Sequence, residues 1–198
     1  MIRNQKTGMD DFFNIVREVK KIALVAVGGL VLLPILAGLG GYTPPWPSGI
    51  AVITSLAELV ILIVVYQLLS HANRSTANRV IACLAIIIFF MSAVYATLNA
   101  VFVYQIPNRA TRVVLGCGLS EKAIAIISEA AFKPVSVCPG ELSTLLASAQ
   151  YDTDKVWSAH SVSLIKLLLV FSWLMAFGGL AALFGVFASF QRRQNSTS

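Results

Sequence analysis

Charged residues are scarce in this chain, and most of them lie outside its apolar runs. Asp, Glu, Lys and Arg make up 12% of the 198 residues, whereas hydrophobic residues make up 57%. A typical soluble domain carries roughly 25% charged residues. The composition therefore argues against a soluble domain folded around a single core.

Catalytic and metal-binding patterns are missing as well. The sequence has no nucleophile elbow, no His-Glu-x-x-His motif and no glycine-rich phosphate loop, and its three cysteines form no Cys-x-x-Cys pair. Asp152, Asp154 and His160 lie close together in the sequence, but such acidic residues are more often solvated loop residues than metal ligands. We expect no catalytic residue, cofactor or metal.

The apolar residues gather in four runs, which cover residues 22–41, 49–70, 80–104 and 161–190. Each run reaches the roughly 20 residues that a helix needs to cross about 30 Å of hydrocarbon. Backbone polar groups must be satisfied internally in lipid, so the runs are expected to be helices. The sequence predicts an all-α membrane protein, a bundle of four transmembrane helices.

The basic residues indicate how the chain is threaded through the bilayer. The arm 1–21, the connector 71–79 and the tail 191–198 together carry nine Lys and Arg residues, whereas the connector 42–48 has none. Positive charge favours the cytoplasmic side, so both termini are expected there and the segment 105–160 outside. The arm has the pattern of an amphipathic helix lying on the membrane surface or docking on a partner. Because the positive charges flank the spans, we expect no direct nucleic-acid binding.

The polar segment 105–160 is expected to form a small subdomain between the third and fourth spans. Ser120 has the position of a cap for a helix that Pro134 ends, and Arg112–Leu115 and Val135–Val137 have strand character. A helical hairpin and a β–α–β unit both fit this pattern. Trp157 is interpreted as an anchor at the membrane interface.

Two cysteines, Cys117 and Cys138, flank the predicted helix of this segment. On the oxidising side of the membrane they are expected to form a disulfide that stabilises a subdomain with little core of its own. If the topology were reversed, they would be two free thiols.

Three polar residues interrupt the apolar runs: Glu58, Asn99 and Lys166. An intramembrane carboxylate is costly, so Glu58 is expected to have a partner, to be protonated or to face water. In one interpretation Glu58 pairs with Lys166 and Asn99 bridges them, lining a pore or a conformational switch. In the other, Lys166 extends alone to the interface and Glu58 is protonated against a neighbouring helix.

Small residues recur at every fourth position of the last run, at Ala181, Gly185 and Ser189. This spacing lets two helices approach closely within a membrane. The contact is expected either inside the bundle or between copies of the chain, and we expect a homo-oligomer because four helices alone enclose little.

The plan of four spans, at residues 22–41, 49–70, 80–104 and 161–190, resembles the membrane subunit of Kiwa, a two-component bacterial anti-phage system. The similarity covers the whole chain as an architecture and includes no residue motif, so it assigns no functional residue. The resemblance implies an oligomeric sensor in the bacterial inner membrane that recruits a cytoplasmic effector. An immunity protein against a toxin and a small ion channel are the alternatives that the same architecture allows.

Overall fold

The computed structural model is mostly helical. It describes residues 32–69, 73–106, 111–121, 123–124, 138, 146–147 and 149–196. The predicted arm 1–21 and the first half of the predicted span 22–41 lie outside these residues.

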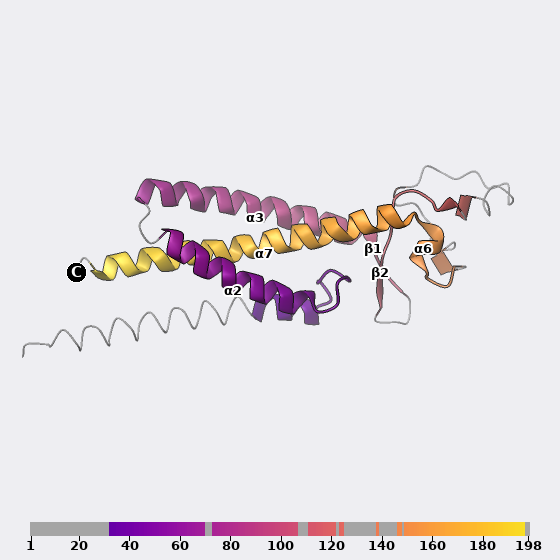
Figure 1. The fold of residues 1–198 in the computed structure, drawn as a ribbon, viewed down its shortest axis with the longest axis horizontal. Helices are drawn as coiled ribbons and strands as arrows, with labels where there is room; N and C mark the ends of the chain where they lie inside the picture. The colour runs from indigo at the N-terminus through magenta and orange to yellow at the C-terminus, as the bar shows by residue number, and fades with distance from the viewer. Residues whose placement is uncertain are drawn as a thin grey trace, which may run out of the picture. The chain divides into compact units, whose positions relative to one another are not determined.

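Three long helices dominate the described part of the chain: α2 (Ile50–Leu69), α3 (Arg74–Phe102) and α7 (Ala159–Ser196) (Figure 1). Each contains an apolar stretch long enough to cross a membrane, at Ile50–Leu69, Ser75–Phe102 and Ala159–Ser189. Twenty residues at 1.5 Å per residue already match the hydrocarbon thickness of about 30 Å. These helices fit an integral membrane protein.

Residues 32–39 are also helical, and this helix ends where the sequence turns to glycine. The N–H of Tyr42 donates to the carbonyl of Ala37 at 2.8 Å, and that of Gly41 donates to Gly38 at 3.1 Å. Gly41 has a φ of 73°, the left-handed conformation that this C-terminal cap requires and that glycine adopts without strain. The helix ends at residue 39, two residues before the predicted end of the first span at residue 41.

The chain divides into two compact units. The first contains Met1–Thr43, Ala51–Ile88 and Ala176–Ser198, and the second contains Pro44–Ile50 and Phe89–Met175. The long helices α3 and α7 are each divided between the two units.

In the first unit, glycines of α7 lie against side chains of the other two long helices. A Cβ added to Gly178 would come within 2.9 Å of the Ile61 side chain of α2, and one added to Gly179 within 2.8 Å of Ile88 of α3. At Gly185 the nearest atoms belong to Val65 of α2, at 3.1 Å. The absence of side chains at these positions lets the helices approach closely.

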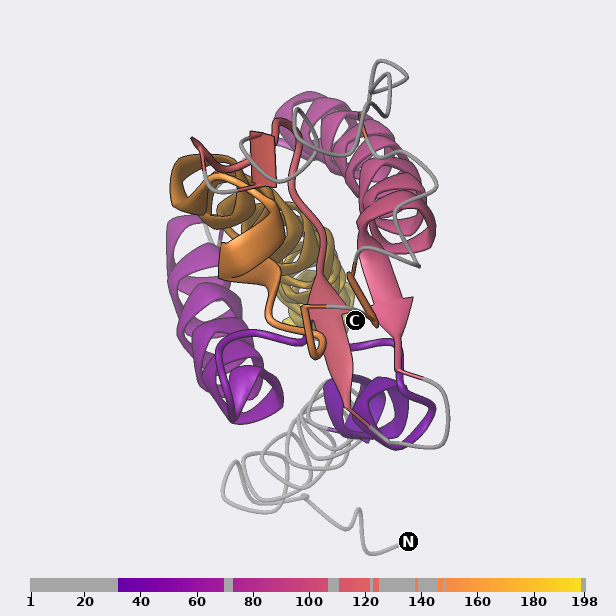
Figure 2. The same ribbon diagram turned by 90° about the vertical axis from the view of Figure 1, so that its right-hand side faces the viewer.

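In the second unit, α3 is followed by a two-stranded antiparallel sheet. The strand β1 (Val103–Gln105) follows α3 directly and pairs with β2 (Arg112–Val114) in the register Val103↔Val114 (Figure 2). The prediction of an all-α fold is therefore wrong at this point. The helix ends at Phe102, before the predicted end of the span at residue 104, because the β-branched and aromatic residues that follow pair with β2.

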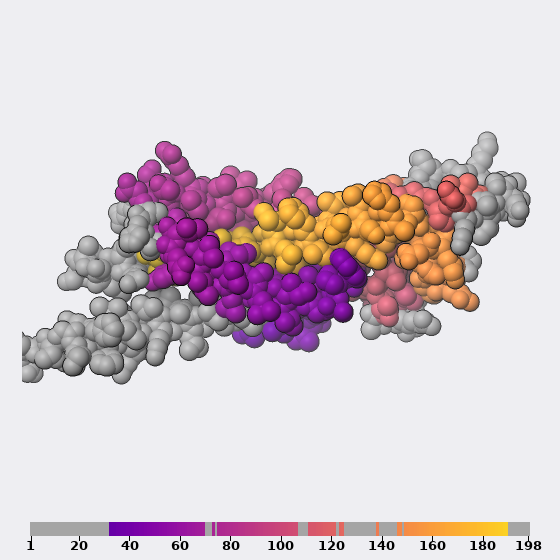
Figure 3. Space-filling view, in the orientation of Figure 1, coloured from indigo at the N-terminus to yellow at the C-terminus, as the bar shows by residue number. Residues whose placement is uncertain are grey.

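The outward faces of the long helices remain apolar. Large side chains such as Val52, Leu56 and Val60 of α2 and Phe89 of α3 are exposed. Figure 3 draws the surface of α2 in indigo to purple. A helix that is apolar all round needs lipid or protein on its outer face, which agrees with a location in a bilayer.

Candidate functional site

The candidate site is the segment between α3 and α7, residues 103–158, which we call the head. Its described residues contain the β1–β2 hairpin, the short helix α6 (Thr153–Val156) and the disulfide. The head is joined to both helices without a flexible linker. On the α3 side, the N–H of Leu115 donates to the carbonyl of Phe102 at 2.7 Å. On the α7 side, Trp157 pairs with Leu119 in an isolated β-bridge, and α7 begins two residues later, at Ala159.

The base of the head packs on α3 and α7. Val114 of β2 is buried with Ile165 and Leu169 of α7, and Phe102 of α3 and Val103 of β1 pack against this cluster. One turn further along α7, the ring of Trp173 lies 5.1 Å from the ring of Tyr95 of α3, tilted by 59°. This tilted geometry is favourable for an aromatic pair and holds the two helices together below the head.

The upper part of the head has a second buried cluster, formed by Leu146, Val156, Trp157 and Val162. Trp157 is its largest side chain and is 1% exposed. A Cβ on Gly116 would come within 2.7 Å of the Trp157 side chain and within 2.6 Å of the Ser161 hydroxyl, so the backbone of the head passes close to the base of this side chain. The interpretation of Trp157 as an interfacial anchor is therefore wrong, because the head covers it.

Backbone hydrogen bonds tie the middle of the head to the start of α7. Leu119 and Trp157 form an isolated antiparallel bridge, in which Ser120 N–H donates to the Val156 carbonyl at 2.9 Å and Ser158 N–H to the Gly118 carbonyl at 3.1 Å. The chain that follows β2 is thus held as an additional extended segment beside α6.

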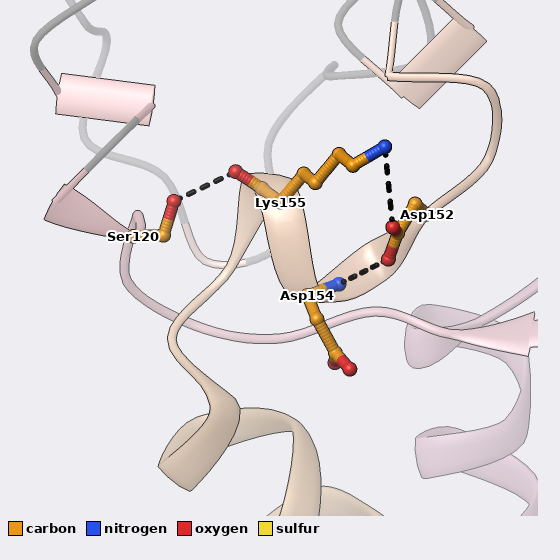
Figure 4. Close-up of polar contacts among 4 residues, drawn as sticks. All are labelled: Ser120, Asp152, Asp154 and Lys155. Carbon is orange, nitrogen blue, oxygen red and sulfur yellow. Dashed lines mark hydrogen bonds and ion pairs between the residues drawn. The ribbon is translucent and has the colours of Figure 1, made fainter.

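Ser120 acts as the cap that the sequence predicts. Its Oγ accepts a hydrogen bond from the N–H of Ala123 at 3.2 Å, the pattern of an N-terminal helix cap. The same hydroxyl donates to the carbonyl of Lys155 at 2.7 Å (Figure 4). Most of the helix predicted after Ser120 lies outside the described residues.

The disulfide links Cys117, three residues after the end of β2, to Cys138. Their Cα atoms are 4.7 Å apart, within the normal range for such a bond. The predicted pairing of these two cysteines therefore agrees with the structure. Of the segment between them, only Gly118–Glu121, Ala123 and Ile124 are described. The third cysteine, Cys83 of α3, is free and exposed.

Of the two acidic residues before α7, Asp152 has a structural role. Asp152 caps α6, since its Oδ1 accepts from the N–H of Asp154 at 3.2 Å, and its Oδ2 lies 3.4 Å from the Nζ of Lys155 (Figure 4). Across the ranges that the structure covers, no group of His, Cys, Asp and Glu side chains is arranged to hold a metal ion.

The three intramembrane polar residues fall in both units. Glu58 belongs to the first unit and is fully buried, and neither of its carboxyl oxygens has a hydrogen-bond partner among the described residues. Asn99 and Lys166 belong to the second unit and are half-buried, and the Oδ1 of Asn99 also has no such partner. The polar layer that would join the three residues remains a prediction.

The predicted small-residue positions Ala181, Gly185 and Ser189 are all buried. Gly185 lies against Val65 and the Leu62 carbonyl of α2, so at this position the close approach is made inside the chain. Sequence reasoning placed Gly178 outside this pattern, although it makes an even closer approach to Ile61.

No family model, curated protein or solved structure matches the chain. The site is a disulfide-linked head built directly on two helices that are long and apolar enough to cross a membrane.

Proposed function

We propose that the chain is a non-enzymatic subunit of the bacterial inner membrane that senses an event outside the cell and anchors a cytoplasmic effector. In this proposal the head lies outside, both termini lie in the cytoplasm, and α3 and α7 connect the two sides. The basic arm, connector and tail supply the surface on which a cytoplasmic protein docks.

The observation that carries this proposal is the direct continuity between the head and the two helices. β1 begins at Val103, immediately after α3 ends at Phe102, and Val114 of β2 is buried against Ile165 and Leu169 of α7. A ligand or force that shifts the hairpin must therefore also shift the ends of both helices, since packed elements move together rather than deform continuously. This is the mechanical arrangement that a transmembrane sensor needs.

The cysteines support the external placement of the head. Disulfides persist on the oxidising side of a bacterial membrane and are rare in the cytoplasm. The Cys117–Cys138 bond therefore agrees with the orientation that the nine basic residues of the arm, connector and tail favour.

We further propose that the subunit is a homo-oligomer that acts in anti-phage defence. The four-span plan supports the defence role by its resemblance to the membrane subunit of Kiwa. Small exposed residues at every fourth position of α3, Ser92, Ala96 and Ala100, support an oligomer because they allow a second helix to approach closely.

The orientation is tested with reporter fusions to the full chain and to chains cut within the head. An alkaline phosphatase fused after Ile106 is expected to be active and a fluorescent protein fused there dark, with the opposite result for fusions after Ser198. Phosphatase activity confined to the fusion after Ser198 would contradict the proposed orientation.

The defence role is tested by phage plating on cells that carry the chain together with its neighbouring gene, and on cells that lack either one. The proposal expects protection only when both are present, and loss of protection when Cys117 and Cys138 are replaced by serine. Protection of the membrane against a co-encoded toxin would instead favour an immunity protein. Ion flux through liposomes that contain the purified chain alone would favour a channel.

A further inference from the structure

Glu58 stands out among the buried polar residues of the first unit. It is the ninth residue of α2 and is 0% exposed, and neither Oε1 nor Oε2 has a hydrogen-bond partner within the described part of the chain. One turn earlier, Thr54 and Ser55 are also buried, and the hydroxyl of Ser55 donates to the carbonyl of Ala51 at 2.9 Å. The carboxyl group is thus buried although it belongs to an apolar helix. The hydroxyl proton of Ser55 is already donated to the Ala51 carbonyl.

Helical spacing places Glu58 on the face of α2 that packs against α7. Ile61 and Val65 follow it at the i+3 and i+7 positions, which lie on the same face of a helix. These two side chains are the ones that lie against Gly178 and Gly185 of α7. Glu58 therefore belongs to the seam between the two helices and not to their lipid-facing surface.

Within the described residues of the first unit, no buried cation accompanies the carboxyl group in this seam. Lys166 of α7 belongs to the second unit and is half-buried. The part of α7 that belongs to the first unit, between Ala176 and Ser189, contains no titratable side chain, and neither does the helix 32–39. On α3, residues 75–88 contribute Arg79 and Cys83, both of which are exposed. On α2 itself the other titratable residue is Tyr66, two turns beyond Glu58.

We propose that Glu58 is a proton-binding site within the membrane-spanning part of the chain, and that it carries its proton while the α2–α7 seam is closed. A buried carboxylate without a cation or a hydrogen-bond donor is unfavourable in an apolar medium, and a bound proton removes the charge. Release of the proton would leave a buried negative charge on α2 one turn before Ile61, so the seam would have to admit water or open. Proton binding and helix packing are thereby coupled.

Infrared spectroscopy of the full chain in lipid bilayers at neutral pH tests this directly. The difference spectrum between the native chain and Glu58→Gln is expected to contain the C=O stretch of a protonated carboxylic acid, shifted in heavy water. The matched control is Glu121→Gln, which removes an exposed carboxyl group of the head and is expected to remove carboxylate bands instead. Carboxylate bands in the Glu58 difference would overturn the proposal.

Two further measurements separate a proton from other partners of the carboxyl group. Exchange of potassium for sodium in the buffer should leave the acid band unchanged, and loss of the band in sodium would assign a metal cation instead. Gln has nearly the same shape as a protonated Glu and is also neutral. The equilibrium constant of unfolding should therefore change less than about tenfold in Glu58→Gln. A loss of more than about a hundredfold, or failure to fold, would show an ion-paired carboxylate and overturn the proposal.

Discussion

The two halves of α7 are packed in different ways, although they belong to one continuous helix. In the second unit its buried side chains are large: Ile165 and Leu169 meet β2, and Trp173 stacks with Tyr95. In the first unit glycines make close approaches to the other helices: Gly178 and Gly185 lie against α2, and Gly179 lies against α3. The change between the two patterns falls within a few residues of Ala176.

Both halves lie within the apolar stretch Ala159–Ser189, so the difference follows from what each half packs against. Ile165 and Leu169 meet the strand β2 of the head, and large apolar side chains fill this contact. Between helices in a lipid environment the hydrophobic effect is absent, because lipid tails are as apolar as leucine, and close van der Waals contact takes its place. Large side chains therefore stabilise the contact of α7 with the head, whereas glycines without side chains stabilise its contact with α2.

The largest effect is expected from removal of the buried indole of the head. Trp157→Ala should destabilise the folded chain by about 3–5 kcal/mol, because it leaves a cavity in a buried cluster beside Gly116. Thermal unfolding in lipid nanodiscs, followed by proteolysis of the head, measures the loss. The matched control is Trp46→Ala, since Trp46 is 46% exposed and should cost less than about 1 kcal/mol. Equal losses for the two variants would contradict the burial of Trp157.

The disulfide should give the next largest effect, and one confined to the head. Replacement of Cys117 and Cys138 by serine removes a link that closes a loop of 21 residues, which is expected to cost about 3 kcal/mol. Unfolding measured with and without a reducing agent checks this. The reductant should lower the stability of the native chain to that of the double variant and leave the double variant unchanged. Cys83→Ser is the control and should retain full sensitivity to the reductant.

The glycine half of α7 gives the opposite test, in which an added methyl group destabilises. Gly185→Ala brings a Cβ within 3.1 Å of Val65 and 3.3 Å of the Leu62 carbonyl, and a backbone atom cannot move aside as a flexible side chain can. We expect a loss of about 1–3 kcal/mol in thermal unfolding.

The control for this prediction is the same substitution at a helical glycine with ordinary space around it. A Cβ on Gly38 would meet only the Thr43 methyl group, at 3.5 Å. Gly38→Ala should be neutral or should stabilise the helix by up to about 1 kcal/mol. A stabilising effect of alanine at both positions would show that the α2–α7 seam has room to spare.

The three described spans were predictable because apolar runs of 20 or more residues have few alternatives in lipid. The predicted runs 49–70 and 161–190 lie close to the limits of α2 and of the apolar stretch of α7. The N-terminal limit of α3 was less predictable: helix begins at Arg74, six residues before the apolar run, since hydropathy alone does not register the polar first turns of a helix.

The interior of the head was predicted less well, because it depends on contacts between distant residues. The strand at Arg112–Val114 and the cap at Ser120 carry local signals, and both are present. The partner of that strand is Val103–Gln105, which in the sequence continues an apolar run and has no signal of its own. The burial of Trp157 likewise depends on chain that folds over it, so its aromatic character alone pointed to the membrane interface instead.

The smallest effect is expected at the exposed ion pair between Asp152 and Lys155 in α6. Two substitutions of Asp152 distinguish its role as a helix cap from its role in the ion pair. Asp152→Asn removes the pairing with Lys155 and keeps the side-chain oxygen that accepts from Asp154 N–H, so it should cost no more than about 0.5 kcal/mol. Asp152→Ala removes both and should cost about 1 kcal/mol. Stability of the head, measured by hydrogen exchange of Val156 and Trp157 amides in the two variants, distinguishes them. If Asn were as costly as Ala, charge and not capping would hold α6, and the polar rim of the head would matter as much as its buried cluster.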